Sequence, residues 1–223
     1  MLPKTIEVKP YTILNFAMTL DGKIASYTGE SSISSQVDKR RVHALRASVD
    51  AVMVGSNTVL VDDPRLDVRY AAGGDPLKVV VDSHLRIPLE SRLVTMYPHR
   101  LVVGCVEGVD KRKARELEGR GVRLLFCGSG DHVDLPLLFE KLYELGVKRL
   151  LVEGGGELNW HLLKNNLIHE VQVTIAPIIV GGKNAKTPVE GEGYPTIGEG
   201  FKLSLISVDR QGEEVVLHYK LTI

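Results

Sequence analysis

The candidate site that stands out most in this chain is an acid followed by three glycines. The stretch LVEGGGELNW, residues 151–160, runs from apolar residues into Glu153, Gly154, Gly155 and Gly156. An apolar strand is expected before this turn and a helix after it, which places the turn where open α/β sheets bind ligands. Residues without a Cβ let the main chain approach a phosphate or a ribose, and the first N–H groups of the helix would face an anion. The alternative is that Glu153 is a surface acid on a tight turn.

A second turn of the same kind follows the apolar stretch 50–55. Ser56, Asn57 and Thr58 supply hydroxyl and amide groups where a short helical segment would begin, and Asp62 lies one helical turn after Thr58. Such a turn could hold the phosphates or the sugar of a cofactor. Neither turn matches a known nucleotide fingerprint, because the chain contains no GxGxxG and no GxxxxGK[ST].

Arginines follow this second turn. Pro64 disfavours helical geometry at the residue before it, so the segment after it is expected to be extended. Arg65, Asp67 and Arg69 would then alternate onto one face, where two guanidiniums could hold a phosphate. The alternative is that these arginines pair with nearby aspartates on the surface.

A third basic group lies on the helix expected to run from a Ser35 cap, with Asp38 as its capping-box acid, to about Ser48. The spacing places three basic residues of this helix on one face and predicts an apolar stripe opposite them. The basic residues are Lys39, His43 and Arg46, and the stripe is Val42, Leu45 and Val49. The basic face is either solvated or binds an anion together with the arginine segment.

The rest of the chain excludes several classes of chemistry. No nucleophile has an adjacent base, and the seven histidines lack metal-ligand spacing, so we expect no metal and no covalent hydrolysis. Anion sites beside one carboxylate suit a reaction in which a cofactor carries the difficult step, as in hydride transfer. Cys105 and Cys127 form no CxxC pair and are interpreted as two buried apolar thiols.

Composition indicates a protein without a nucleic-acid or membrane partner. Lys and Arg number 28 and Asp and Glu also number 28, so no net charge attracts a polyanion. No stretch of 18 apolar residues could span a bilayer, and the first residues do not resemble a secretory signal. We therefore expect a soluble, cytoplasmic protein.

Strand and helix patterns alternate along most of the chain. This order predicts one α/β domain, residues 1–223, with a mostly parallel mixed sheet flanked by helices. The last two strands, separated by Asp209–Gly212, are expected to form an antiparallel hairpin at one edge. The expected strands cover 11–17, 50–55, 77–82, 100–104, 122–126, 149–152, 170–176, 201–208 and 213–222, with further helices at 110–117, 135–145 and 157–165.

Five stretches together resemble the riboflavin-biosynthesis reductases. They are MTLDGKIA at 18–25, HALRASVDAVMVGSNTVLVDDPRLDVR at 43–69, VVVDSHLRIP at 79–88, LLVEGGGELNW at 150–160 and IAPIIVGGK at 175–183. The resemblance, strongest to the stand-alone archaeal members, implies a dihydrofolate-reductase-like fold and a homodimer. It also implies NADPH as cofactor and a pyrimidine ribosyl phosphate as small-molecule substrate, whose ribosylamino group becomes ribitylamino. The HxE and PCxxC motifs of the zinc deaminase that is fused to bacterial relatives are absent.

The resemblance also assigns site residues by position. Arg86 is the candidate for the 2′-phosphate of NADPH, because its fork of donors suits a dianion. A tryptophan that contacts the cofactor in bacterial relatives corresponds to Ile33. The implied cofactor residues are Ala17, Thr58, Asp62, Ser83, His84, Leu85, Arg86, Gly130, Gly154, Gly155 and Gly156. The implied substrate residues are Ser31, Arg46, Leu66, Arg69 and Glu153.

Under this hypothesis the ribosylamine opens to an imine and hydride reaches C1′. Glu153, the candidate catalytic residue, either anchors the substrate or protonates the nitrogen, and water is the alternative proton source. Two other functions stay open. A dihydrofolate reductase would leave Arg46 and Arg69 without a phosphate, and a nucleotide-binding module would bind NADPH without oxidising it.

Overall fold

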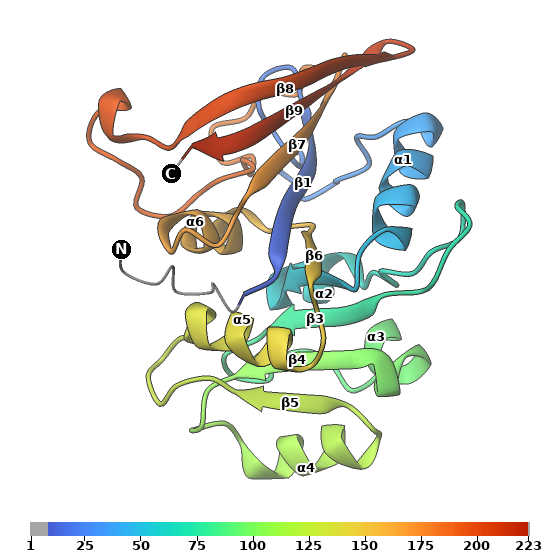
Figure 1. Cartoon of the computed structure of the whole chain (residues 1–223), viewed down its shortest axis with the longest axis vertical. Coiled ribbons are helices and arrows are strands. Elements are labelled where there is room, and N and C mark those ends of the chain that lie inside the picture. Colours follow the sequence, from blue (N-terminus) through green and yellow to red (C-terminus); the bar gives the residue numbers. More distant parts are fainter. Residues whose placement is uncertain (1–8, 223) are drawn as a thin grey trace, which may run out of the picture.

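Nine strands form one mixed sheet in the computed structural model, which describes residues 9–222 (Figure 1). Their order across the sheet is β5-β4-β3-β2-β6-β1-β7-β9-β8. The strands are β1 Tyr11–Thr19, β2 Ala51–Gly55, β3 Leu77–Val81, β4 Leu101–Cys105, β5 Arg123–Phe126, β6 Arg149–Val152, β7 Glu170–Ala176, β8 Lys202–Gln211 and β9 Glu214–Thr222. The helices are α1 Gln36–Ala47, α2 Ser56–Asp62, α3 Arg92–Met96, α4 Lys111–Gly119, α5 Leu135–Glu144 and α6 Gly156–Lys164.

The sheet is parallel from β5 to β7 and antiparallel at its last two pairings, β7 with β9 and β9 with β8. The predicted fold class, a mostly parallel sheet with a C-terminal antiparallel hairpin, is confirmed. The predicted turn at 209–212 is wrong in length, because Gln211 pairs with Glu214 and only two residues separate the strands. Gly212 has a φ of 66°, the left-handed conformation that such a tight turn requires. The predicted domain of 1–223 includes residues 1–8 and 223, which lie outside the described residues.

Helices cover both faces of the parallel region, and each face has its own apolar core. Neighbouring residues of a strand point to opposite faces, so Val52 packs with α3 and α4 while Met53 packs with α5 and α6. Strands buried on both faces are apolar along their whole length, as AVMV in β2 illustrates. This two-faced core fixes the ends of β1, β2, β3 and β6, where the candidate site lies.

The start of α1 differs from the predicted capping box. Ser35 does cap the helix, since its Oγ accepts from the N–H of Asp38 at 3.2 Å. The Ser35 N–H donates to the carboxylate of Glu214 in β9, at 2.8 Å, and not to that of Asp38. The Asp38 side chain instead accepts from Arg41 and Thr174. A residue of the C-terminal hairpin therefore fixes the first turn of α1.

The predicted apolar stripe of α1 is also wrong in part. Leu45 and Val49 join the core beside α3 and α4, but Val42 lies beside the basic residues and not opposite them. The reason is geometric, because a residue three positions after Lys39 is its neighbour on a helix. The buried residues of α1 itself are Asp38 and His43.

The segment after α2 does not alternate as predicted. Asp63 ends the helix with a φ of 41°, and Leu66 has a φ of 53°. The left-handed turn at Leu66 buries its side chain and that of Asp67, whose carboxylate pairs with Arg69 at 3.0 Å, so the segment is not the regular extended strand that was predicted. Of Arg65, Asp67 and Arg69, only Arg69 lines the candidate site described below.

Cys105 and Cys127 are both free and fully buried, which confirms their interpretation as apolar thiols. Burial raises the pKa of Cys105 to about 12 and that of Cys127 to about 11, which keeps both thiols protonated. Among residues 9–222, no helix has the length and apolar character needed to cross a membrane.

Candidate functional site

One large cleft opens at the carboxyl ends of β1, β2, β3 and β6, and most of the predicted site residues line it. Its volume is about 1510 Å³. A pocket for one small ligand has a volume of roughly 300–1,000 Å³, so this cleft is larger than a pocket for one small ligand. The predicted residues in its lining are Ala17, Ser31, Arg46, Thr58, Asp62, Arg69, Ser83, Arg86, Glu153, Gly154, Gly155 and Gly156.

Four predicted residues lie outside the lining. Leu66 and Leu85 are buried, at 2% and 1% exposure, and both have a φ of 53°. Their side chains belong to the core, so at these positions only the backbone is available to a ligand. His84 and Gly130 are exposed, and neither is part of the lining.

Glu153 and Arg46 form a two-pronged ion pair inside the cleft. Arg46 donates from Nε to one carboxylate oxygen at 2.7 Å and from Nη2 to the other at 2.6 Å. A third donor, Nη1, reaches the carbonyl of Asp67 at 3.0 Å. Burial disfavours the charge of Arg46, but Glu153 outweighs this and raises the pKa of Arg46. Arg46 therefore holds both carboxylate oxygens of Glu153, and most donors of Arg46 are already used.

His43 and Arg69 form the next part of this wall. The N–H of Arg69 donates to Nδ1 of His43 at 2.9 Å, so the proton of a neutral His43 lies on Nε2. Burial, followed by the charges of Arg46 and Arg69, lowers the pKa of His43. The Arg69 guanidinium pairs with Asp67 at 3.0 Å and is 44% exposed, so it retains donors for an anion. We name Arg46, Glu153, His43 and Arg69 the charged wall.

The three glycines of the opening motif are needed for two different reasons. Gly154 and Gly155 have φ values of 95° and 81°, which residues with a side chain rarely adopt. At Gly156 a Cβ would lie 2.6 Å from Cγ of Glu190 and 2.7 Å from the carbonyl of Thr187. Glu190 and Thr187 therefore occupy the space beside Gly156 that a side chain would need, and all three glycines line the cleft.

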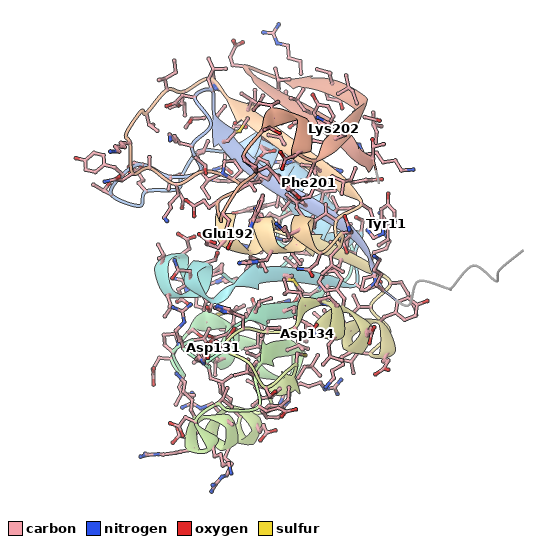
Figure 2. All side chains as sticks on the ribbon, turned by 90° about the vertical axis from the view of Figure 1, so that its left-hand side faces the viewer. Tyr11, Asp131, Asp134, Glu192, Phe201 and Lys202 are labelled. Carbon is pink, nitrogen blue, oxygen red and sulfur yellow. The ribbon has the colours of Figure 1, made fainter. Side chains whose placement is uncertain are left out.

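The loop that carries Glu190 is anchored on α6. Trp160 of α6 contacts the rings of Tyr194 and Phe201, with centroid distances of 5.3 and 6.0 Å. Figure 2 shows Phe201 between the hairpin and α6. This aromatic cluster holds the loop against the glycine turn, and the Glu190 N–H donates to the carbonyl of Gly156 at 3.1 Å.

Polar side chains from two further turns line another part of the cleft. Arg86 donates to Oγ of Ser56 at 2.6 Å, yet its side chain is 54% exposed. Ser31 donates to Asp62 at 3.3 Å, which joins a predicted substrate residue to a predicted cofactor residue. We name the Gly154–Gly156 turn, the start of α2 and Arg86 the glycine wall.

Asn15 and Asp38 also line the cleft, although the sequence predicted no role for Asn15 and only a capping role for Asp38. Asn15 is 5% exposed and Asp38 is fully buried. A signal for Asn15 was available, because an amide within the apolar run TILNFAM needs a hydrogen-bond partner. No such signal marked Asp38, since its position beside a serine cap suits a capping acid equally well.

Comparison with known proteins gives matches over almost the whole chain. The chain is 45% identical over 215 residues to the 2,5-diamino-6-ribosylamino-4(3H)-pyrimidinone 5′-phosphate reductase of Methanothermobacter thermautotrophicus, covering 95% of this chain and 98% of that protein. Among solved structures, RibD of Acinetobacter baumannii superposes with a TM-score of 0.84 at 26% identity. That match covers 96% of this chain and 58% of the RibD chain.

A more distant match concerns the fold alone. Dihydrofolate reductase from Enterococcus faecalis, complexed with NADP(H) and RAB-propyl, superposes with a TM-score of 0.55 at 10% identity. The predicted dihydrofolate-reductase-like fold is thereby confirmed. The family model described as the RibD C-terminal domain matches residues 10–217. The chain therefore belongs to the RibD C-terminal domain family, as its resemblance to the riboflavin-biosynthesis reductases predicted.

Proposed function

We propose that this protein reduces 2,5-diamino-6-(ribosylamino)-4(3H)-pyrimidinone 5′-phosphate to the ribitylamino product with NADPH. The observation that carries the proposal is one cleft with two unlike walls, in a chain 45% identical to a reductase named for this substrate. The glycine wall suits the cofactor and the charged wall suits the sugar phosphate. The cleft volume of about 1510 Å³ is sufficient for both.

The residues of the glycine wall fit NADPH. Gly154 and Gly155 present main chain with no side chain, and the N–H groups at the start of α6 suit a phosphate. Arg86 is tethered through Ser56, and its Nε lies 3.8 Å from a carboxylate oxygen of Asp82, but its side chain is half exposed, so its remaining donors can meet the 2′-phosphate. When bound, NADPH supplies the hydride for C1′ of the ring-opened substrate. Ala17, Thr58, Asp62, Ser83, and the backbone at His84, Leu85 and Gly130 complete the proposed cofactor site.

On the charged wall we propose that Arg69 holds the phosphate and that Glu153 anchors the ribose. Arg46 donates to both oxygens of Glu153, which favours an ionised acceptor over a proton donor. Glu153 would accept from a ribose hydroxyl and stabilise positive charge on the imine nitrogen, while water supplies the proton. Arg46 acts here by holding Glu153, and the backbone of Leu66 borders the same side. Ser31, which donates to Asp62 of α2, completes the proposed substrate residues from the glycine wall.

The test is to incubate the protein with NADPH and the ribosylaminopyrimidine phosphate and to follow absorbance and product mass. We expect one NADPH oxidised for each product that gains two hydrogens. Dihydrofolate serves as the control substrate and should leave NADPH unoxidised. NADPH binding without oxidation on either substrate would contradict the proposal and favour a nucleotide-binding module.

We also propose a homodimer in the cytoplasm. The edge strand β8 exposes an apolar row, in which Leu203, Leu205, Ile206 and Val208 are 43–57% exposed. An exposed edge of this kind favours pairing with a second copy. Sedimentation velocity should show a dimer for the wild type and a monomer for Leu205→Asp. A wild-type monomer at micromolar concentration would exclude the homodimer. Cell fractionation tests the location.

A further inference from the structure

The two arginines of the charged wall pair with different carboxylates, and the two pairs leave different numbers of donors free. Arg46 donates to both oxygens of Glu153, at 2.7 and 2.6 Å. The Nε of Arg69 lies 3.0 Å from Oδ1 of Asp67, in an ion pair whose angles make no hydrogen bond. Neither Nη group of Arg69 donates to any residue that the structure describes. Arg46 is thus closed to a ligand, whereas Arg69 is open.

The second oxygen of Asp67 is held by a tyrosine outside the cleft. Oδ2 accepts from Oη of Tyr97, the residue that ends α3, at 3.0 Å. The carbonyl of Asp67 accepts from Arg46 at 3.0 Å, so backbone and side chain are both fixed. Burial, followed by the hydrogen bond to Asp67, raises the pKa of Tyr97, which keeps its hydroxyl a donor. Asp67 therefore presents a single oxygen to Arg69.

A buried lysine fixes the ring of Tyr97. Lys78 of β3 is fully buried, and its Nζ lies 4.7 Å from the centroid of that ring. Its Nζ donates to the carboxylate of Asp75 and, at 2.9 Å, to the carbonyl of Pro76. The other oxygen of Asp75 accepts from the N–H of Val68 at 3.1 Å. Lys78 therefore anchors both the tyrosine and the segment that carries the open arginine.

We propose that Tyr97 is a positioning residue for the phosphate site, because its hydroxyl keeps Asp67 from closing on Arg69. This inference rests on the proposed function, in which Arg69 holds the substrate phosphate. Asp67 orients the guanidinium through Nε and leaves both Nη groups to the phosphate, which arginine binds best through parallel hydrogen bonds. Without the hydroxyl, both oxygens of Asp67 can turn to Arg69, in a two-pronged pair like that of Glu153, and compete with the phosphate.

The variant Tyr97→Phe tests this role by removing one oxygen atom. It keeps the ring that contacts Lys78. We expect the KM for the phosphorylated substrate to rise about tenfold with kcat nearly unchanged, because the phosphate is remote from the reacting carbon. The kcat/KM for the dephosphorylated substrate should be the same in the variant and the wild type. An equal loss on both substrates would show a merely structural role and overturn the proposal.

Tyr143→Phe is the matched control. Tyr143 of α5 lies outside the lining of the cleft, and the Nζ of Lys148 lies 3.1 Å from its ring centroid. This variant loses the same atom from a similar lysine–tyrosine contact and should keep the KM of the wild type. A tenfold rise in KM here as well would remove the special role of Tyr97.

A double-mutant cycle tests whether Tyr97 acts through Arg69. Added to Arg69→Ala, Tyr97→Phe should cause almost no further rise in KM, since the guanidinium that it keeps open is absent. A further tenfold rise would mean that the hydroxyl acts by another route, and the proposal would fall.

A binding measurement separates this inference from the proposed function. Ribose 5-phosphate is titrated calorimetrically into the wild type and into Tyr97→Phe, which requires no turnover. We expect about tenfold weaker binding to the variant. Equal affinity, or binding to neither protein, would overturn the inference. If the ribosylaminopyrimidine phosphate is not reduced but this difference in affinity is found, the proposed function fails while the positioning role stands.

Discussion

The two walls of the cleft are organised in opposite ways. On the charged wall, Arg46, Glu153, His43 and Arg69 already contact one another or Asp67. On the glycine wall the geometry resides in the backbone, through the positive φ at Gly154 and Gly155, and Arg86 remains half exposed. Side-chain pairing therefore preorganises the charged wall, and chain conformation preorganises the glycine wall. Substitutions on the charged wall should therefore have different effects from substitutions on the glycine wall.

The largest effect is expected from Arg46→Met on the charged wall. It leaves Glu153 without its partner where both side chains are only 12–13% exposed. Breaking such a pair destabilises a protein by about 3–5 kcal/mol. We expect urea unfolding to show a loss of this size and kcat/KM to fall about 10³-fold.

A double-mutant cycle with Glu153→Gln sharpens this prediction. The two changes should be strongly non-additive, since each removes the same pair. Additive losses would mean that Arg46 and Glu153 act separately, and the charged wall would not be a preorganised unit.

The next effect is expected on the glycine wall from Gly156→Ala. The added Cβ would lie within 2.7 Å of the Thr187 carbonyl and must displace the loop that carries Glu190. A misplacement of about 1 Å can cost roughly 10²-fold, so we expect the Kd of NADPH to rise by about that factor. Fluorescence titration measures it. Gly108→Ala is the control, because nothing lies within 4 Å of its Cβ position. Equal behaviour of the two variants would remove the steric account.

Two arginine substitutions with smaller effects should distinguish the walls by the ligand whose binding each one weakens. Arg86→Ala should weaken NADPH about tenfold and leave NADH unchanged, because a partly exposed charged hydrogen bond contributes modestly. Arg69→Ala is the matched control, an exposed arginine of the same cleft on the other wall. It should raise the KM for the pyrimidine and leave NADPH binding unaltered. The reverse outcome would exchange the assignments of the two walls.

The smallest effect concerns pH. The pKa of His43 is lowered by burial and by Arg46 and Arg69, so the unfolded chain binds this proton more readily than the folded one. Stability should therefore rise with pH between the lowered value and the ordinary pKa near 6.5. In His43→Gln, which keeps an acceptor for the Arg69 N–H, this rise should disappear. Unfolding measured across that window compares the two, and identical slopes would refute the prediction.

Features set by neighbouring residues could be predicted from the sequence, whereas contacts between residues far apart in the chain could not. Local signals were sufficient for the glycine turn at Gly154–Gly156 and for most strands, since apolar runs and turn residues act over a few positions. The pairing of Arg46 with Glu153 spans 107 positions and was not foreseen. The hydrogen bond from the Ser35 N–H to Glu214, in place of the predicted bond to Asp38, also joins residues far apart in the chain and was not foreseen. Left-handed turns at Leu66 and Leu85 were also hidden, because leucine carries no signal for them.

The most direct test of the two-wall account is a crystal structure of the protein with NADPH and the ribitylamino product. We predict that the dinucleotide lies against Thr58 and Gly154–Gly156, with its 2′-phosphate at Arg86, and that the product phosphate meets Arg69. A dinucleotide bound away from Thr58 and Gly154–Gly156 would contradict the account.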